Sequence, residues 1–153
     1  MKSILLVNLF LITLSSSFNM GNCKEKYSIK IWDYDYSMAY TTFYKIDADS
    51  VTVQGISGIN NEHDSILMQR SLSEQECKMV WGFLSSHNIT GLKNKYSNPL
   101  VDDGDRKRVI LDVKDKSKTI EIENFYQKDM GELFDVINKI VNKDLQIKYK
   151  QPS

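Results

Sequence analysis

Two helical stripes of apolar residues, set among segments that alternate with period two, most constrain what this chain can fold into. The first stripe predicts a helix over residues 74–86, because its apolar residues recur at the i, i+3, i+4 and i+7 spacing of one helix face. Ser73 and Glu76 form a capping box, which satisfies N–H groups at a helix start. The stripe consists of Cys77, Val80, Trp81 and Leu84.

A second stripe predicts a helix over residues 130–142. Asp129 and Glu132 resemble the same capping pattern, with an acidic residue at the expected N-cap. The apolar residues of this stripe are Met130, Leu133, Phe134, Ile137, Ile140 and Val141.

Residues 106–123 alternate apolar and polar side chains on both sides of the turn 114–117, which is the pattern of a β-hairpin. Pairing Val113 with Lys118 would place the apolar residues of both strands on one face, because side chains in a strand alternate between faces. The same register predicts that Arg108 lies opposite Glu123.

The remaining strands are expected over residues 27–36, 40–46, 49–54 and 65–70, with a possible last short strand over 146–149. The chain is 41% hydrophobic and has only 7 Gly and 2 Pro, and no linker interrupts residues 27–150. The sequence therefore predicts one α+β domain there, a two-layer sandwich of an antiparallel sheet with two amphipathic helices on one face.

The charge balance argues against nucleic acid as a partner. The chain has 20 Lys and Arg against 20 Asp and Glu, so it lacks the basic excess that phosphate backbones attract. Its 2 Cys are too few for a zinc site built on cysteines alone, and its 2 His occur without an HExxH or CxxC motif, so no zinc site is expected. We therefore expect no metal and no cofactor.

Residues 1–22 read as a signal peptide. Lys2 precedes an apolar run over residues 4–14, which is shorter than the roughly 20 residues that span a bilayer. The residues before Cys23, Met20-Gly21-Asn22, resemble the lipobox of bacterial lipoproteins, although that motif usually has Leu and a small residue in place of Met20 and Asn22. The resemblance implies acylation of Cys23, a polar tether over residues 23–26 and anchoring to a bacterial membrane. The architecture is also similar to several families of small secreted bacterial proteins, an analogy that carries little about function.

A second interpretation of the leader remains open. Ser15 and Ser17 form a small-x-small pattern, which is typical of ordinary signal-peptide cleavage and would give a soluble secreted or periplasmic protein. Cys23 would then be a thiol or a disulfide partner in an oxidising compartment. Cys77 lies on a helical apolar stripe and is expected to be buried and unpaired.

The aromatic segment from Trp32 to Tyr36 is the most informative part for function. On a regular strand, Trp32, Tyr34 and Tyr36 share one face, and Ile29 and Ile31 share the other. Either a bulge redirects the strand, or the rings lie away from the core. In the second case they predict a binding surface for a protein or glycan.

Two polar groups are the only candidates for catalysis. His63 and Asp64 stand together in a polar loop, and Asp102, Asp103, Gly104 and Asp105 form the densest acidic group. A solvated loop at His63 and Asp64, and a turn at Gly104, are the favoured interpretations.

We therefore expect a non-enzymatic lipoprotein of the cell envelope, or a secreted binding module of the same compartment. An envelope enzyme or enzyme inhibitor that uses His63 and the loop from Asp102 to Asp105 is the alternative. A subunit of a larger envelope assembly is a third class.

Overall fold

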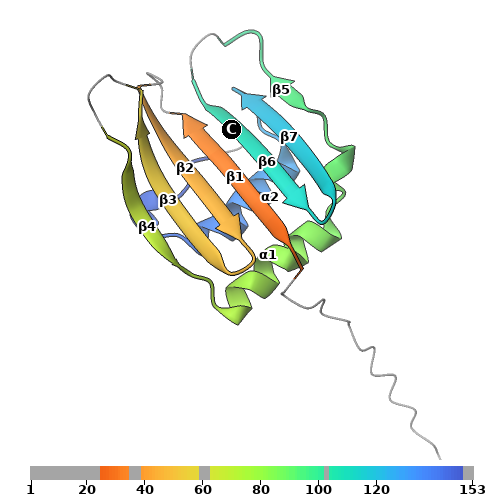
Figure 1. The fold of residues 1–153 in the computed structure, drawn as a ribbon. Helices are drawn as coiled ribbons and strands as arrows, with labels where there is room; N and C mark the ends of the chain where they lie inside the picture. Colours follow the sequence, from red (N-terminus) through yellow and green to blue (C-terminus); the bar gives the residue numbers. More distant parts are fainter. Residues whose placement is uncertain (1–24, 35–38, 59–62, 102–103, 150–153) are drawn as a thin grey trace, which may run out of the picture.

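The computed structural model describes residues 25–34, 39–58, 63–101 and 104–149, which form one seven-stranded sheet with two α-helices (Figure 1). The sheet order is β4-β3-β2-β1-β6-β7-β5, and every neighbouring pair is antiparallel except β5 and β7. The predicted α+β class is confirmed. The strands are β1 (Tyr27–Tyr34), β2 (Tyr40–Asp47), β3 (Ser50–Ser57), β4 (Ser65–Ser71), β5 (Lys95–Ser97), β6 (Arg106–Val113) and β7 (Lys116–Glu123).

The helices are α1 (Glu74–Ser86) and α2 (Lys128–Asn138); in the view of Figure 1, α2 lies behind the sheet and α1 runs across its lower end. Two short 3₁₀ turns, η1 (Ile89–Gly91) and η2 (Lys143–Leu145), follow the helices. His87 at the end of α1 links the two helices, because its Nε2 lies 2.9 Å from Glu132 Oε2.

The side chains on the two faces of the central strand β1 differ in burial. Ile29 and Ile31 are fully buried, whereas Lys30 and Trp32 on the opposite face remain partly exposed. Ile29 and Ile31 belong to the same core cluster as Leu133 of α2, which is also fully buried. The hydrophobic core therefore lies on the helix side of the sheet.

Helix α1 has the predicted limits and the predicted capping box. Ser73 accepts a hydrogen bond from the Glu76 N–H, and the Glu76 carboxylate accepts one from the Ser73 N–H. Glu76 also accepts two hydrogen bonds from the Arg70 guanidinium, at 2.6 and 2.9 Å. Arg70 in turn donates to the carbonyl of Ile140 at 2.6 Å, so this cluster joins β4, α1 and the segment after α2.

Removing the Glu76 charge is expected to lower stability in a pH-dependent way. Its hydrogen bonds with Arg70, followed by those from Ser73, lower the pKa of Glu76 from 4.5 to about 2. The stabilisation is therefore complete above pH 4.5 and is lost as the pH falls toward about 2. Glu76→Gln should cost about 1 kcal/mol at pH 7 and almost nothing at pH 2, as measured by urea unfolding.

The exposed Glu121 supplies the control for this measurement. Glu121→Gln should change the free energy of unfolding little at either pH. An equal cost of Glu76→Gln at pH 7 and pH 2 would contradict the charged interaction.

Helix α2 begins and ends earlier than the sequence indicates. Its N-cap is Gln127 rather than Asp129, and the Gln127 side chain accepts a hydrogen bond from the Met130 N–H at 2.7 Å. Glu132 contacts His87 instead of closing a capping box. Ile140 is buried although it lies beyond the helix, so the apolar stripe continues after the helical geometry has ended.

The hairpin of β6 and β7 has the predicted faces but not the predicted register. Val113 pairs with Lys116, not Lys118, and Arg108 lies opposite Glu121, not Glu123. The turn is shorter than predicted, because Lys114 adopts a left-handed conformation with φ 54°. The observed register differs from the predicted one by two residues. Because side chains alternate between faces with a period of two, the same residues of both strands remain buried.

One further strand prediction is wrong, and one strand was missed. Residues 146–149 form no strand, and the short strand β5 was not predicted. β5 has three residues and pairs in parallel with β7. A segment this short has neither the length nor the alternation of apolar and polar residues from which a strand is predicted.

Candidate functional site

Strand β1 is regular through its aromatic residues. Trp32 lies opposite Phe43 of β2 and Arg108 of β6, and the pairing continues without a shift to Tyr34. The alternative of a bulge in β1 is therefore not what the structure has, and Trp32 and Tyr34 lie on the face opposite the core. Tyr36 lies outside the described residues.

Trp32 is the centre of a small cluster on this open face. Its ring centroid lies 4.8 Å from that of Phe43, and the Arg108 Cζ atom lies 5.8 Å from it. Trp32 and Phe43 are partly buried and Arg108 is exposed. We call these three residues the aromatic cluster. Arg108 is attracted to Trp32, because a guanidinium near an indole ring gains a cation–π interaction.

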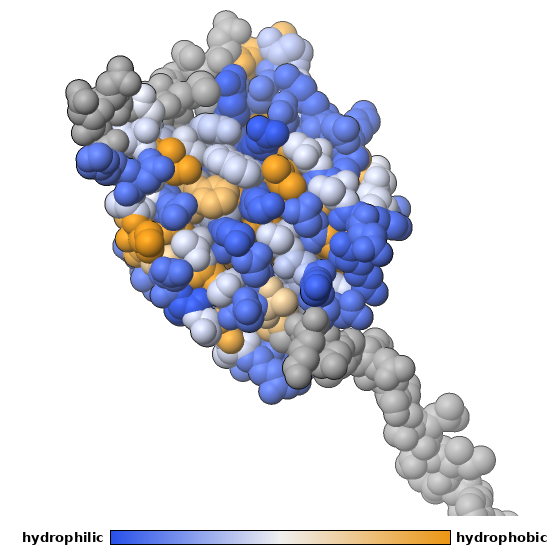
Figure 2. Space-filling view, viewed as in Figure 1, coloured by the Kyte–Doolittle hydropathy of each residue, from blue (hydrophilic) through white to orange (hydrophobic). Residues whose placement is uncertain are grey.

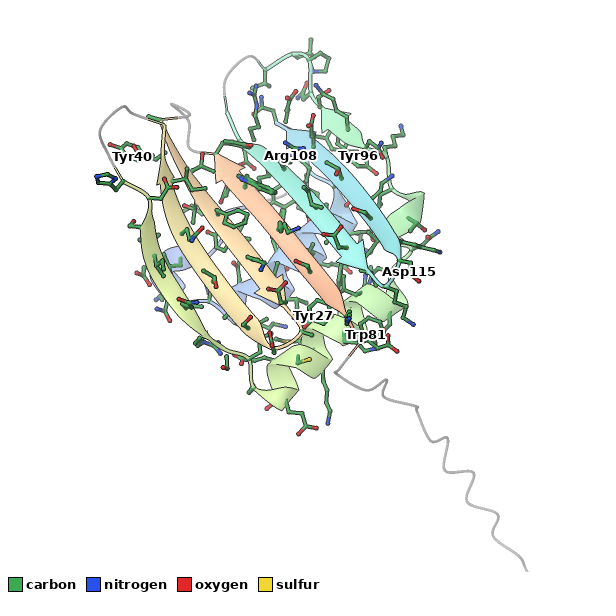
Figure 3. The ribbon with its side chains drawn as sticks, viewed as in Figure 1. Tyr27, Tyr40, Trp81, Tyr96, Arg108 and Asp115 are labelled. Carbon is green, nitrogen blue, oxygen red and sulfur yellow. The ribbon has the colours of Figure 1, made fainter. Side chains whose placement is uncertain are left out.

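The surroundings of this cluster are largely polar. Figure 2 views the sheet from the same side and shows mostly hydrophilic surface, with apolar residues in separate areas rather than one continuous patch. Figure 3 shows Arg108 and Tyr40 toward the same end of the sheet, away from the end that carries Tyr27 and Asp115. The cluster therefore lies beside the sheet end at which β2 begins.

A pocket of about 630 Å³ lies at this end of the sheet. It continues from the open face, through Tyr34 and Thr41, to the buried face and the segment after η2. Its wall includes Asp33, Tyr34, Tyr40, Thr41, Thr42 and Gln146. We call it the Lys107 pocket, after the buried lysine that forms its floor.

Lys107 is the one charged residue buried among the described part of the chain, with 2% of its surface exposed. Its Nζ donates to Asp33 Oδ1 at 2.7 Å and to Asp105 Oδ1, and it lies 5.8 Å from the centre of the Tyr149 ring. Burying an ammonium group is costly unless it is paired and hydrogen-bonded, and these two carboxylates provide the pairing.

Burial also changes the pKa of Asp33. Desolvation raises the pKa of Asp33 above its ordinary value, and the attraction and hydrogen bond of Lys107 oppose that rise without cancelling it. Tyr44, which lines the pocket, donates to the carbonyl of Leu145 at 3.0 Å. This bond holds the C-terminal segment against β2.

Sequence reasoning missed Lys107. Its position was informative, because Lys107 lies two residues before Val109 and therefore on the same face of the strand. A lysine on the buried face requires a partner. Asp33 is available as that partner, because it lies an even number of residues from Ile29 and Ile31 and therefore on the same face of β1. Asp105, interpreted as part of a turn, is the second partner.

The two polar candidates from the sequence do not converge in the described structure. His63 and Asp64 are both exposed, and Asp64 Oδ1 accepts a hydrogen bond from the Ser57 N–H at 3.3 Å. Neither residue lines the Lys107 pocket, whereas Asp105 does. Asp102 and Asp103 lie outside the described residues. Within residues 25–34, 39–58, 63–101 and 104–149, no three His, Cys, Asp or Glu side chains are grouped to hold a metal ion.

Cys77 is buried, as predicted, with 2% of its surface exposed. The prediction that it is unpaired is wrong, because Cys77 is disulfide-bonded. The chain contains 2 Cys, so an intrachain partner can only be Cys23, which lies outside the described residues. Tyr27, four residues after Cys23 in the sequence, stacks on Trp81, one helical turn after Cys77.

A second pocket, of about 590 Å³, lies at the opposite end of the sheet beside Tyr27 and Ser28. The hydroxyl oxygens of both residues are buried without a hydrogen-bond partner. Burial raises the pKa of Tyr27 to about 12. The two side chains point to opposite faces of β1.

Comparison with known protein families finds no match for this chain, and no curated protein matches it at a significant level. In the part of the chain that the structure describes, neither helix has the length and apolarity needed to cross a membrane.

Proposed function

We propose that this protein is a non-enzymatic binding module of the bacterial cell envelope, with a binding surface that includes Trp32 and Tyr34. We further propose a two-layer sandwich in which both amphipathic helices cover one face of the sheet and leave the other open to a ligand. The partner is a protein or glycan of the envelope, and Tyr36 would extend the same surface.

One observation carries this proposal: Trp32 and Tyr34 of a central, regular strand lie on the face away from the core. Rings in the middle of a sheet normally contribute to a hydrophobic core, where their burial stabilises the fold. Here Trp32 and Tyr34 lie outside the core and remain partly exposed. Tyr and Trp give rigid contact area with a polar tip, which suits a binding surface.

The enzyme alternative has weaker support. Asp105 is engaged by Lys107, and His63 contributes nothing to the pocket that contains them. A catalytic base must lie within hydrogen-bond reach of a reacting group in a site that substrate can enter.

The disulfide of Cys77 bears on the location within the envelope. Acylation of Cys23 and an intrachain disulfide would consume the same thiol, so they exclude each other. Disulfides persist in oxidising compartments outside the cytosol. We therefore favour the soluble secreted or periplasmic form over the lipid-anchored form.

Mass spectrometry of the mature protein is expected to distinguish the two forms. The favoured form should show no lipid mass and should gain the mass of two hydrogens on reduction. Cys77→Ser should abolish that gain and leave one thiol for alkylation. A mature mass that includes acyl chains at Cys23 would contradict the disulfide and restore the lipoprotein interpretation.

Replacing the rings of the binding surface is expected to abolish partner capture without unfolding the protein. The mature protein, immobilised on beads, would be incubated with a bacterial envelope extract, and the variant Trp32→Ala with Tyr34→Ala would be compared with wild type. Truncating partly exposed rings should cost capture at least tenfold, which is the effect of about 1.4 kcal/mol.

The control is Thr52→Ala with Thr119→Ala, which removes two other side chains that the strand alternation places on the same face. This control should capture as wild type does. Equal capture by wild type and both variants would contradict the proposed surface, and circular dichroism would verify that each variant is folded.

A further inference from the structure

We infer that the Lys107 pocket binds a neutral saccharide unit, an inference that rests on the proposed binding function and names its ligand class. The pocket volume of about 630 Å³ lies within the range of small-molecule sites, roughly 300–1,000 Å³. Tyr34 belongs both to this pocket and to the open-face surface, so a longer glycan could occupy both.

The charges of the pocket argue against an anionic ligand. Its lining has three carboxylates, Asp33, Asp105 and Asp144, against two ammonium groups, Lys107 and Lys148. The Lys107 charge is already matched by two carboxylates. An incoming phosphate or carboxylate would meet net negative charge, and like charges close together repel.

A metal ion and an apolar ligand fit no better. The described carboxylates of the pocket do not form a group of three that could hold a metal. The wall also carries hydroxyl and amide groups, those of Thr41, Thr42 and Gln146. An apolar ligand would leave these polar groups without partners, which is costly.

A saccharide matches each of these features. Its hydroxyls donate to carboxylates and accept from Thr, Tyr and amide groups. Asp33 presents such a carboxylate, with 20% of its side chain exposed. Tyr40, which is 48% exposed at the pocket rim, offers a ring face on which the C–H side of a pyranose could stack.

The scarcity of apolar surface also favours a polar ligand. The open face beside the pocket has no continuous apolar patch (Figure 2), whereas the centre of a stable protein–protein interface is normally apolar. A hydrated polyol tolerates this surface, because water can bridge polar groups to a ligand.

The test is titration of the mature, disulfide-bonded protein with maltotetraose, cellotetraose and the tetramer of N-acetylglucosamine, by calorimetry and by two-dimensional NMR. We expect at least one of the three to bind, with the largest amide shifts at Thr41, Thr42 and Gln146. Binding by none of the three would overturn the inference.

Two variants locate the site. Tyr40→Ala and Asp33→Asn should each weaken the affinity for the bound oligosaccharide at least tenfold. Phe125→Ala is the matched control, because Phe125 is an exposed aromatic residue, 43% accessible, outside the pocket. It should bind as wild type does. If neither pocket variant changes the affinity, the saccharide does not bind here and the inference is overturned.

The outcome also separates this inference from the proposed function. Absence of saccharide binding, together with envelope capture that still depends on Trp32 and Tyr34, would overturn only the saccharide inference. Saccharide binding that is lost in Tyr40→Ala while Trp32→Ala with Tyr34→Ala leaves envelope capture unchanged would support the pocket and contradict the open-face surface.

Discussion

Lys107→Met is expected to lower the free energy of unfolding by about 3–5 kcal/mol at pH 7, the usual cost of removing one partner from a buried ion pair. Methionine nearly reproduces the shape of lysine, so the loss would come from charge rather than from a cavity. The substitution leaves Asp33 desolvated and without its ammonium partner. Urea unfolding followed by circular dichroism measures the effect.

Two comparisons identify the origin of this loss. The double variant Lys107→Met with Asp33→Asn should recover much of the stability, because it removes the unpaired carboxylate as well. Lys45→Met breaks an ion pair with Asp47 at a lysine that is 46% exposed and should cost less than about 1 kcal/mol. A similarly small cost for Lys107→Met would contradict the account of the pocket.

The pH dependence of this variant has a definite sign. Burial already raises the pKa of Asp33, and loss of Lys107 would raise it further. A raised carboxyl pKa makes the folded state bind a proton before the unfolded state does. The penalty of Lys107→Met should therefore shrink as the pH falls toward the folded pKa of Asp33.

Phe134→Ala should cost about 3–5 kcal/mol, the usual range for a buried phenylalanine. Phe134 is 1% exposed, and its ring meets that of Tyr149 edge-on, with centroids 5.0 Å apart. The loss would be a large part of the roughly 5–15 kcal/mol by which domains are typically stable. Thermal unfolding measures it, and Phe125→Ala, at an exposed ring, supplies the control. An unchanged melting temperature would show that α2 does not anchor the core.

Local patterns predicted the parts of the fold that depend on neighbouring residues. Helix α1 was predictable because Ser73 and Glu76 mark its start within one turn. The faces of β6 and β7 were predictable because alternation determines them. Their register was not, because it depends on Lys114 adopting a positive φ, which favours glycine or asparagine and is not indicated by a lysine.

Only the aromatic residues of the candidate site could be predicted from the sequence. Alternation along β1 placed Trp32 and Tyr34 together without reference to any other strand. The cluster of Lys107 with Asp33 joins residues 74 positions apart, and no local pattern reports such a contact. The disulfide of Cys77 was missed for a related reason, since a small residue on an apolar stripe looks the same whether or not it is bonded.

The central position of β1 determines the order in which the sheet can be completed. β1, β2, β3 and β4 are neighbours in both sequence and space, so they can form successive hairpins early. The other edge of β1 pairs with β6, which lies more than 70 residues later in the chain. Non-local pairing of this kind slows folding. Until β6 is available, a growing chain exposes the hydrogen-bonding edge of its central strand, which is a template for aggregation. A chain that stops before β6 should therefore accumulate as aggregates rather than as a smaller folded domain.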